Sequence, residues 1–143
     1  MVDLSSFKRF GQKKSFWGEI QTVKCFEDNT IVKKTLSSDG TGKVLVVDGS
    51  GSTGRALMGD IVAGLAVDNS WGGVIIHGSI RDSAEVNELN LGVIALNITP
   101  RRPKKENLGE KNQIIEFANT KFRPGDYIYC DQDGVLISTE KLL

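Results

Sequence analysis

Three short segments in the middle of the chain are almost entirely apolar, and each contains or is bounded by glycine. They cover residues 42–49, 72–78 and 91–97. A continuous apolar run of this length is typical of a β-strand that is buried on both faces. The pattern therefore predicts three buried strands.

The segments between these strands have a helical pattern. In residues 55–70, Leu57, Ile61 and Leu65 recur every four positions, which predicts a helix with these three side chains on one face. Residues 83–90 predict a second, shorter helix. An alternation of strand and helix favours parallel strands with helices packed on a face of the sheet.

The flanking segments predict further strands, which we expect to be antiparallel. Apolar residues alternate along 15–26, which indicates a strand, and a short helix follows with Asn29 as its N-cap. Residues 113–138 read as strands joined by turns at Pro124-Gly125 and Asp133-Gly134. We therefore expect an α/β fold with a mixed sheet.

The composition is that of an ordinary globular protein, and the 143 residues suit a single domain, 1–143. Lysine plus arginine equal aspartate plus glutamate, 18 against 18, so the net charge gives no general attraction to nucleic acid or to an anionic membrane. No apolar run approaches a membrane span, and the first residues lack the apolar segment of a secretory signal. Cys25 and Cys130 form no CxxC motif, and we expect reduced, buried thiols in a cytoplasmic protein.

Residues 49–54, GSGSTG, match the pattern G-x-G-x-x-G. A dinucleotide site also needs an acidic residue at the end of the next strand, but that strand ends in His77-Gly78. A P-loop is excluded because no Gly-Lys-Ser/Thr follows. Besides a nucleotide site, which the missing acid disfavours, two interpretations remain: a tight turn, or backbone N–H groups near a helix start that hold a carboxylate.

Arg81 and Asp82 follow the strand at 72–78, and Asp60 lies on the preceding helix. Ligands of open α/β sheets gather beyond the carboxyl ends of the strands. If the strands are adjacent, the three side chains converge on one crevice with the glycine-rich segment as its wall. The alternative is an ordinary turn with an ion pair.

The spacing of Gly59-Asp60, Arg81-Asp82 and Glu85 resembles the signature of the RraA-like family. That family includes 4-hydroxy-4-methyl-2-oxoglutarate aldolases, which also decarboxylate oxaloacetate, and the regulator of ribonuclease activity A. The flanking text agrees over nearly the whole chain: GKVLVVDG, NSWGGVIIHGSIRD, LNLGVIALNITPRRPKK and FRPGDYIYCDQDGVLI. The resemblance implies a swivelling β/β/α fold, a homotrimer with sites at subunit borders, and a divalent metal cation, Mg²⁺ or Mn²⁺.

The resemblance also implies roles for individual residues. Arg81 would bind the carboxylate and oxo group of a small 2-oxo acid, Asp82 would be the metal ligand, and Asp60 would orient a catalytic water. The pyruvyl end of the substrate would be lined by Gly59, Asp60, Ile61 and Val62. The glycine-rich segment would then shape an oxo-acid pocket. A metal beside Arg81 suits the chemistry, because aldol cleavage and oxaloacetate decarboxylation both develop negative charge on a pyruvate enolate.

An alternative function is also implied, that of a non-catalytic regulator that binds and inhibits an RNA-degrading enzyme of the ribonuclease E type or its helicase partners. The segment VKCFEDN, 23–29, is closer to this branch of the family. The regulators tend to lack the aspartate of the Arg-Asp pair, so Asp82 favours the lyase. The family also usually has a helix before the stretch matching 7–29, and some aldolases add an acid from a neighbour's C-terminal extension. Met1 and the end at Leu143 suggest that both are missing here, which would weaken substrate closure or trimer contacts.

Four other features have ordinary interpretations. The basic cluster at 101–111 is expected to be a solvated loop, with anion or RNA contact as the alternative. The sequence DQDG at 131–134 predicts a hairpin turn and lacks the other ligands of a calcium loop. Trp17 and Trp71 are expected to pack in the core or an interface, and His77 to be buried or at the rim of the site.

Overall fold

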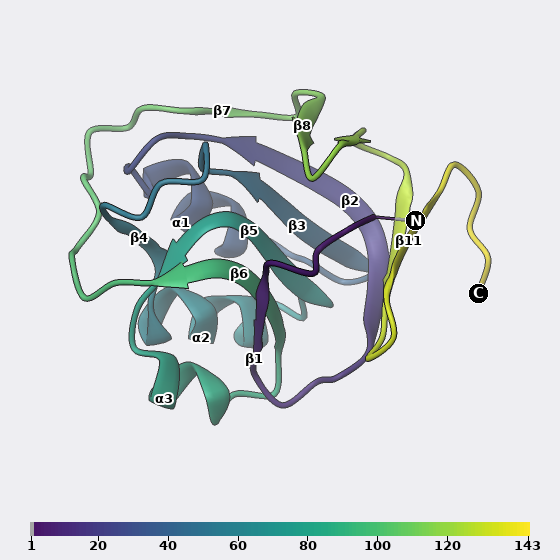
Figure 1. Cartoon of the computed structure of the whole chain (residues 1–143), viewed down its shortest axis with the longest axis horizontal. Helices are drawn as coiled ribbons and strands as arrows, with labels where there is room; N and C mark the ends of the chain where they lie inside the picture. Colours follow the sequence, from purple (N-terminus) through teal and green to yellow (C-terminus); the bar gives the residue numbers. More distant parts are fainter. Residues whose placement is uncertain (1) are drawn as a thin grey trace.

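The computed structural model describes residues 2–143, which form one mixed sheet with helices on one side (Figure 1). Four parallel strands make its centre, in the spatial order β2-β3-β5-β6. They are β2 (Phe16–Lys24), β3 (Lys43–Asp48), β5 (Gly73–Ile80) and β6 (Gly92–Ile98). The three apolar segments and the alternating segment thus form the predicted strands. The alternating segment, β2, pairs parallel with β3, however, and is not an antiparallel flanking strand as expected.

The remaining strands extend this centre. At one edge β1 (Lys8–Phe10) pairs antiparallel with β6, and at the other β10 (Tyr127–Cys130) and β11 (Val135–Ser138) continue antiparallel from β2. The short β4 (Ala56–Met58) pairs with the end of β5, and β7 (Glu110–Lys111) pairs with β2. A separate hairpin is formed by β8 (Ile115–Phe117) and β9 (Thr120–Phe122).

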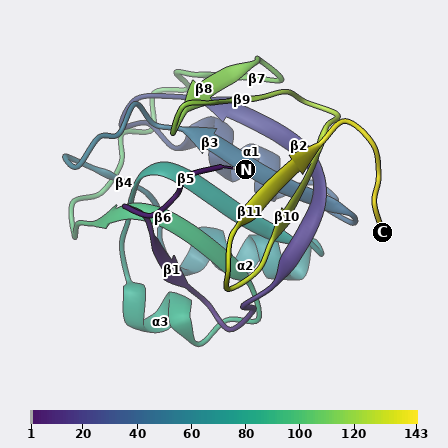
Figure 2. The same ribbon diagram turned by 45° about the vertical axis from the view of Figure 1, so that its right-hand side comes forward.

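Both faces of the sheet are covered. On one face α1 (Thr30–Leu36), α2 (Asp60–Asp68) and α3 (Ser83–Asn87) share a buried cluster with β3 and β5. On the other face the β8–β9 hairpin and the curled β10–β11 hairpin, seen in front in Figure 2, enclose a second cluster. This is the β/β/α layering expected from the sequence. None of the helices within residues 2–143 is long and apolar enough to cross a membrane.

The predicted helix face at 55–70 is wrong. Leu57 lies in β4, Ile61 is 71% exposed, and the buried side chains of α2 are Val62, Ala63 and Ala66. The cause is the pairing of β4 with β5, which extends the chain as far as the N-cap residue and starts the helix at Asp60. The four-residue spacing of Leu57 and Ile61 therefore spans two different elements.

Asn29 occupies the predicted N-cap position of α1, but its side chain makes no capping bond. The Asp28 carboxylate takes that role by accepting the Thr30 N–H at 3.0 Å. The predicted turns at Pro124-Gly125 and Asp133-Gly134 are present, and Gly125 uses its positive φ of 93° there.

Candidate active site

A crevice of about 140 Å³ opens where β4 and β5 end and α2 begins. Four of its lining residues are Gly59, Asp60, Ile61 and Val62, and Arg81 adds a guanidinium from the end of β5. This is the carboxyl edge of the parallel strands, where ligands of open sheets bind. The structure therefore brings together the residues that were predicted to line the pyruvyl end of a substrate.

Asp82 contacts two residues of this crevice but is not one of its lining residues. Its Oδ2 accepts the backbone N–H of Asp60 at 3.3 Å and lies 3.6 Å from Nε of Arg81. The three residues therefore lie together, with Asp60 and Arg81 in the lining of the crevice and Asp82 in contact with both of them. The Arg81 contact is also the ion pair of the alternative interpretation, and it uses only one nitrogen of the guanidinium.

Backbone geometry turns the Asp82 side chain toward α2. Asp82 has φ 56° and ψ 42°, in the left-handed region that non-glycine residues seldom occupy. The residue is the N-cap of α3, yet its side chain does not cap that helix. An unusual backbone conformation held at a crevice is typical of a functional site.

Gly59 makes this close approach possible. A Cβ at Gly59 would lie 2.6 Å from Oδ2 of Asp82 and 3.1 Å from Nε of Arg81. Only glycine fits without displacing the carboxylate. The glycine of the Gly59-Asp60 pair is thus required by the pair Arg81-Asp82, 22 residues later along the chain.

The outer wall of the crevice is cationic. Besides Arg81, it contains Lys33 of α1 and, from the loop after β6, Arg102 and Lys105. The only carboxylate among the lining residues is Asp60. The basic cluster at 101–111 is exposed, as predicted for a solvated loop, but two of its side chains face the site. The position of this loop after the carboxyl end of a buried strand was a signal that the sequence interpretation missed.

Comparison with known proteins decides the family. The sequence profile of the RraA-like family, described as Aldolase/RraA, matches residues 2–137. The chain belongs to the RraA-like family. Among curated relatives, a Shewanella oneidensis protein is 50% identical over 96% of this chain and 84% of its own length. A Dechloromonas aromatica protein is 48% identical over 95% of this chain and 83% of its own length. Both are provisionally named 4-hydroxy-4-methyl-2-oxoglutarate aldolase.

Two solved structures are also similar. One, from Geobacillus kaustophilus, is titled an S-adenosylmethionine: 2-dimethylmenaquinone methyltransferase. It is 43% identical to this chain and superposes with a TM-score of 0.95. The match covers 99% of this chain and 88% of that one. The other, from Thermus, is titled the RNA-processing inhibitor RraA. It is 37% identical to this chain, with a TM-score of 0.97, and the match covers 100% of this chain and 87% of that one. The names given to these relatives thus disagree in function while the fold is shared.

The glycine-rich segment of this RraA-like chain does not form a wall of the crevice, contrary to prediction. Gly49 and Gly51 both donate their N–H groups to the carbonyl of His77, at 3.0 Å each. Ser50, Ser52 and Gly54 donate to Asp48, Gly49 and Ser52 in turn. The segment also leads into a strand, β4, and not into a helix. Its donors are satisfied internally, which leaves none of these five for a phosphate or a carboxylate.

His77 lies outside the crevice, in agreement with its predicted structural role. Its Nδ1 is 3.4 Å from Oδ1 of Asp48, and its ring stacks on Phe117 with centroids 4.7 Å apart. Phe7 stacks on the same histidine at 5.9 Å. The side chain is part of the packing on the sheet face opposite the helices.

The RraA-like site can accept a divalent cation. Asp82 is about a third exposed, and its hydrogen bond to the protein uses only Oδ2. Within residues 2–143 no group of three His, Cys, Asp or Glu side chains is placed to hold a metal. Mg²⁺ needs only one or two protein carboxylates because it retains several waters. Asp82 therefore fits a hydrated ion such as Mg²⁺ or Mn²⁺ and does not fit a cage of protein ligands.

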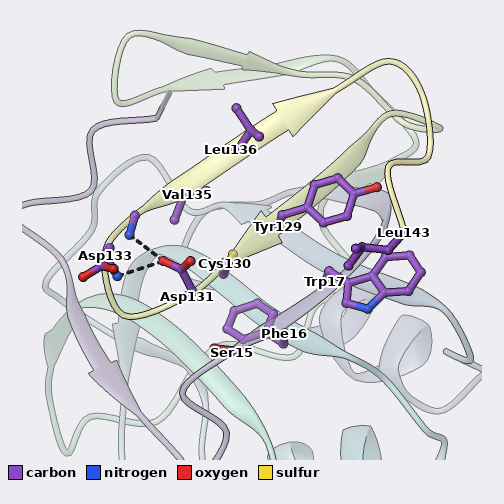
Figure 3. Close-up of a pocket in the computed structure, with 11 residues that line it drawn as sticks. Ser15, Phe16, Trp17, Tyr129, Cys130, Asp131, Asp133, Val135, Leu136 and Leu143 are labelled. Carbon is purple, nitrogen blue, oxygen red and sulfur yellow. Dashed lines mark hydrogen bonds between the residues drawn. The ribbon is translucent and has the colours of Figure 1, made fainter.

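A wider cleft of about 540 Å³ lies elsewhere, between the start of β2 and the β10–β11 hairpin (Figure 3). Trp17 stacks there on Tyr129 with centroids 5.7 Å apart, while Trp71 is buried and donates Nε1–H to the Ser38 carbonyl. Asp131 accepts the N–H groups of Asp133 and Gly134, which confirms a hairpin turn at DQDG. This cleft is larger than the crevice, but its lining contains no lysine or arginine, and of its two side-chain carboxylates Asp131 is already bonded within the turn.

Both cysteines are free and buried, as expected. Burial raises the pKa of the Cys25 thiol to about 12, and burial raises that of Cys130 to about 12 as well. Thiols with such pKa values are not nucleophiles at neutral pH. Covalent cysteine catalysis is therefore excluded for these two residues.

Proposed function

We propose that the protein is a carbon–carbon lyase that cleaves 4-hydroxy-4-methyl-2-oxoglutarate to pyruvate and also decarboxylates oxaloacetate, with a divalent cation as cofactor. The observation that supports it best is that Asp60 and Arg81 line a small crevice with cationic walls while Asp82 contacts both residues. The names of relatives at 48–50% identity support the same activity. The reaction needs a fixed cation and a nearby proton acceptor, and the crevice offers both.

Arg81 would hold the substrate's 2-oxo and carboxylate oxygens. Its recorded contact with Asp82 uses Nε, and neither Nη atom makes a hydrogen bond within residues 2–143. A guanidinium can therefore present two parallel N–H donors to a carboxylate, a geometry that lysine cannot reproduce. The N-terminus of α2 at Asp60 adds positive potential to the same place.

Asp82 would hold the cation, which would stabilise negative charge on the same two substrate oxygens. The Asp60 carboxylate would position a water that removes the proton from the 4-hydroxyl group. The bond between C3 and C4 then breaks, one pyruvate leaves, and the other forms as an enolate that takes a proton at C3. In oxaloacetate the same bond breaks with loss of carbon dioxide, so no hydroxyl proton has to be removed.

The cationic wall suits the second carboxylate of these substrates. Arg102, Lys105 and Lys33 also line the crevice. Since these side chains are largely exposed, each contributes modestly to binding. Together they favour a dianionic 2-oxo acid over pyruvate itself.

The proposal includes a homotrimer with the crevice at a subunit border. Ile61, which lines the crevice, is 71% exposed, and Ile98 at the end of β6 is 42% exposed. Apolar side chains of this size are better accommodated at a subunit contact. Light scattering should give three times the 15.6 kDa chain mass. We place this assembly in the cytoplasm, where free thiols such as Cys25 and Cys130 stay reduced.

The direct test is oxaloacetate decarboxylation by purified protein. Activity should stop with EDTA and return with Mg²⁺ or Mn²⁺, above the rate of the metal alone. Asp82→Asn should remain folded and lose this metal-dependent rate. Folded wild-type protein that does not exceed the metal-only rate would refute the proposal.

Regulation of an RNA-degrading enzyme is the second candidate function. It is favoured by the segment 23–29 and by the Thermus relative titled an RNA-processing inhibitor. A pull-down with purified ribonuclease distinguishes the two functions. Asp82→Asn should abolish catalysis and spare an inhibitory complex.

A further inference from the structure

Asp28 is a fully buried carboxylate, with an exposed fraction of 0%. It lies between β2 and α1, outside the lining of the crevice. A buried charge is costly unless several hydrogen bonds satisfy it. The groups that bond to Asp28 therefore indicate what this charge organises.

The two oxygens of Asp28 bond to segments that are far apart in the sequence. Oδ1 accepts the N–H of Thr30, the first residue of α1, at 3.0 Å. Oδ2 accepts the N–H of Glu106, in the loop after β6, at 2.6 Å. These two segments carry Lys33 and Lys105, which form part of the cationic wall. One carboxylate thus connects both supports of that wall.

The loop between β6 and β7 depends on such contacts because it forms no regular secondary structure apart from a single bridge between Asp28 and Lys104. Lys104 donates its N–H to the Glu27 carbonyl at 2.7 Å and accepts the Asn29 N–H at 3.2 Å. The hydroxyl of Thr30 accepts the Asn107 N–H at 3.2 Å. Among these bonds, the one from Glu106 to Asp28 has an ionised acceptor, which makes it roughly twice as strong as a neutral bond.

We infer that Asp28 is a positioning residue that fixes Lys33 and Lys105 around the crevice, and thereby sets the preference of the enzyme for dianionic over monoanionic 2-oxo acids. The inference rests on the proposed lyase function. Asp28 itself touches no substrate. Its effect should appear in the binding of the second carboxylate and not in the chemistry at the pyruvyl end.

The charge state of Asp28 supports a permanent anchor. Burial raises the pKa of the Asp28 carboxyl, but hydrogen bonds from Thr30, Glu106 and Leu108 outweigh this and lower it. The group therefore stays ionised throughout the neutral range.

The test uses Asp28→Asn, in which the amide keeps the size of the side chain but replaces one acceptor oxygen with a donor. Two reactions are measured: oxaloacetate decarboxylation, which involves two carboxylates, and exchange of pyruvate methyl protons with D₂O, which involves one. We expect KM for oxaloacetate to rise about tenfold, as for loss of one hydrogen bond to a charged group, with kcat and pyruvate exchange within about twofold. Lys105→Ala should add little to Asp28→Asn, because both changes remove the same wall.

Asp39→Asn is the matched control. Asp39 accepts the Thr41 N–H at 3.0 Å in the same kind of turn, but it is exposed and lies away from the crevice. The substitution Asp39→Asn should leave both reactions unchanged. If Asp28→Asn does not fold, Thr30→Val removes the exposed bond from Asn107 and should raise KM for oxaloacetate by a smaller factor.

Three outcomes would each overturn the inference. In Asp28→Asn, both reactions could lose rate equally, or KM for oxaloacetate could stay unchanged. The effects of Asp28→Asn and Lys105→Ala on that KM could also be fully additive. Amide hydrogen exchange provides a readout that does not need activity. The amides of residues 104–107 should exchange faster in Asp28→Asn than in Asp39→Asn. If wild-type protein lacks lyase activity, the proposed function fails, and unchanged exchange in Asp28→Asn would separately refute the anchor.

Discussion

Two neighbouring strands of the sheet end in polar turns, and only one of these turns contributes to the crevice. After β3, the glycine-rich segment places five backbone donors close together, but all five bond within that segment or to β3 and β5. After β5, Arg81 and Asp82 form one ion pair, and within residues 2–143 the Nη atoms of Arg81 and Oδ1 of Asp82 make no hydrogen bond. A position at the carboxyl edge of a sheet is therefore not enough to make a site. The polar groups must also lack partners in the protein.

The largest effect should come from Asp82→Asn. Loss of the cation ligand should lower oxaloacetate turnover by at least about 100-fold, while the melting temperature changes little because the side chain is partly exposed. Asp48→Asn is the counterpart at the other turn, where the carboxylate is 8% exposed and accepts the Ser50 N–H. It should lower the melting temperature and leave turnover per folded molecule intact. The reverse result would mean that the two turns have been assigned the wrong roles.

Arg81→Lys should have the next largest effect. If Arg81 clamps a carboxylate through two N–H donors, kcat/KM should fall by the equivalent of about 2–4 kcal/mol. If it only pairs with Asp82, the change should be small, since partly exposed pairs contribute about 0–1 kcal/mol. Steady-state kinetics and a melting curve on the same variant separate the two. Near-wild-type kinetics would indicate that Arg81 only pairs with Asp82 and does not bind the substrate.

A glycine substitution at each turn sharpens the same contrast. In Gly59→Ala the new Cβ meets Oδ2 of Asp82, so activity should fall about tenfold through displacement of that carboxylate. In Gly51→Ala the cost is backbone strain at φ 69°, about 1–2 kcal/mol of stability, with unchanged turnover per folded molecule. Equal activity in both variants would show that the position of Asp82 is not critical.

Acid should loosen the cationic wall that Asp28 supports. The pKa of Asp28 is lowered in the folded state, so its contribution to the free energy of unfolding is present above the unfolded value of about 3.9 and is lost as the pH falls through the folded value. Urea unfolding of wild type should therefore become easier below about pH 4. In Asp28→Asn this part of the pH dependence should be missing. An identical pH profile in the variant would exclude Asp28 as the acid-sensitive anchor.

Much of the fold could be predicted from local patterns. The buried strands, the parallel pairing of β3, β5 and β6 and the hairpin turns follow from apolar runs and turn residues that lie close together in the sequence. The strand β4 was missed because Leu57, at its centre, fits the four-residue helical spacing of the residues that follow. Only the pairing of β4 with β5 shows that this segment is a strand. Such pairing is a long-range property that a periodicity does not contain.

The candidate site was predictable only in part, because some of its contacts join segments that are far apart in the sequence. Asp60, Arg81 and Asp82 could be placed by their spacing and by the family resemblance. The role of Lys105 could not, because it depends on a bond between Asp28 and Glu106, 78 residues apart. Nor could the motif at 49–54 reveal that its donors are already occupied, since their main acceptor, the carbonyl of His77, lies on another strand.

The central claim is tested most directly by the stoichiometry of 4-hydroxy-4-methyl-2-oxoglutarate cleavage. Purified protein with Mg²⁺ should release two pyruvate molecules for each molecule of substrate consumed, with no release after EDTA treatment and none from Asp82→Asn. Pyruvate can be counted against loss of substrate in the same sample. Substrate that remains intact in the presence of folded, metal-loaded protein would contradict the account.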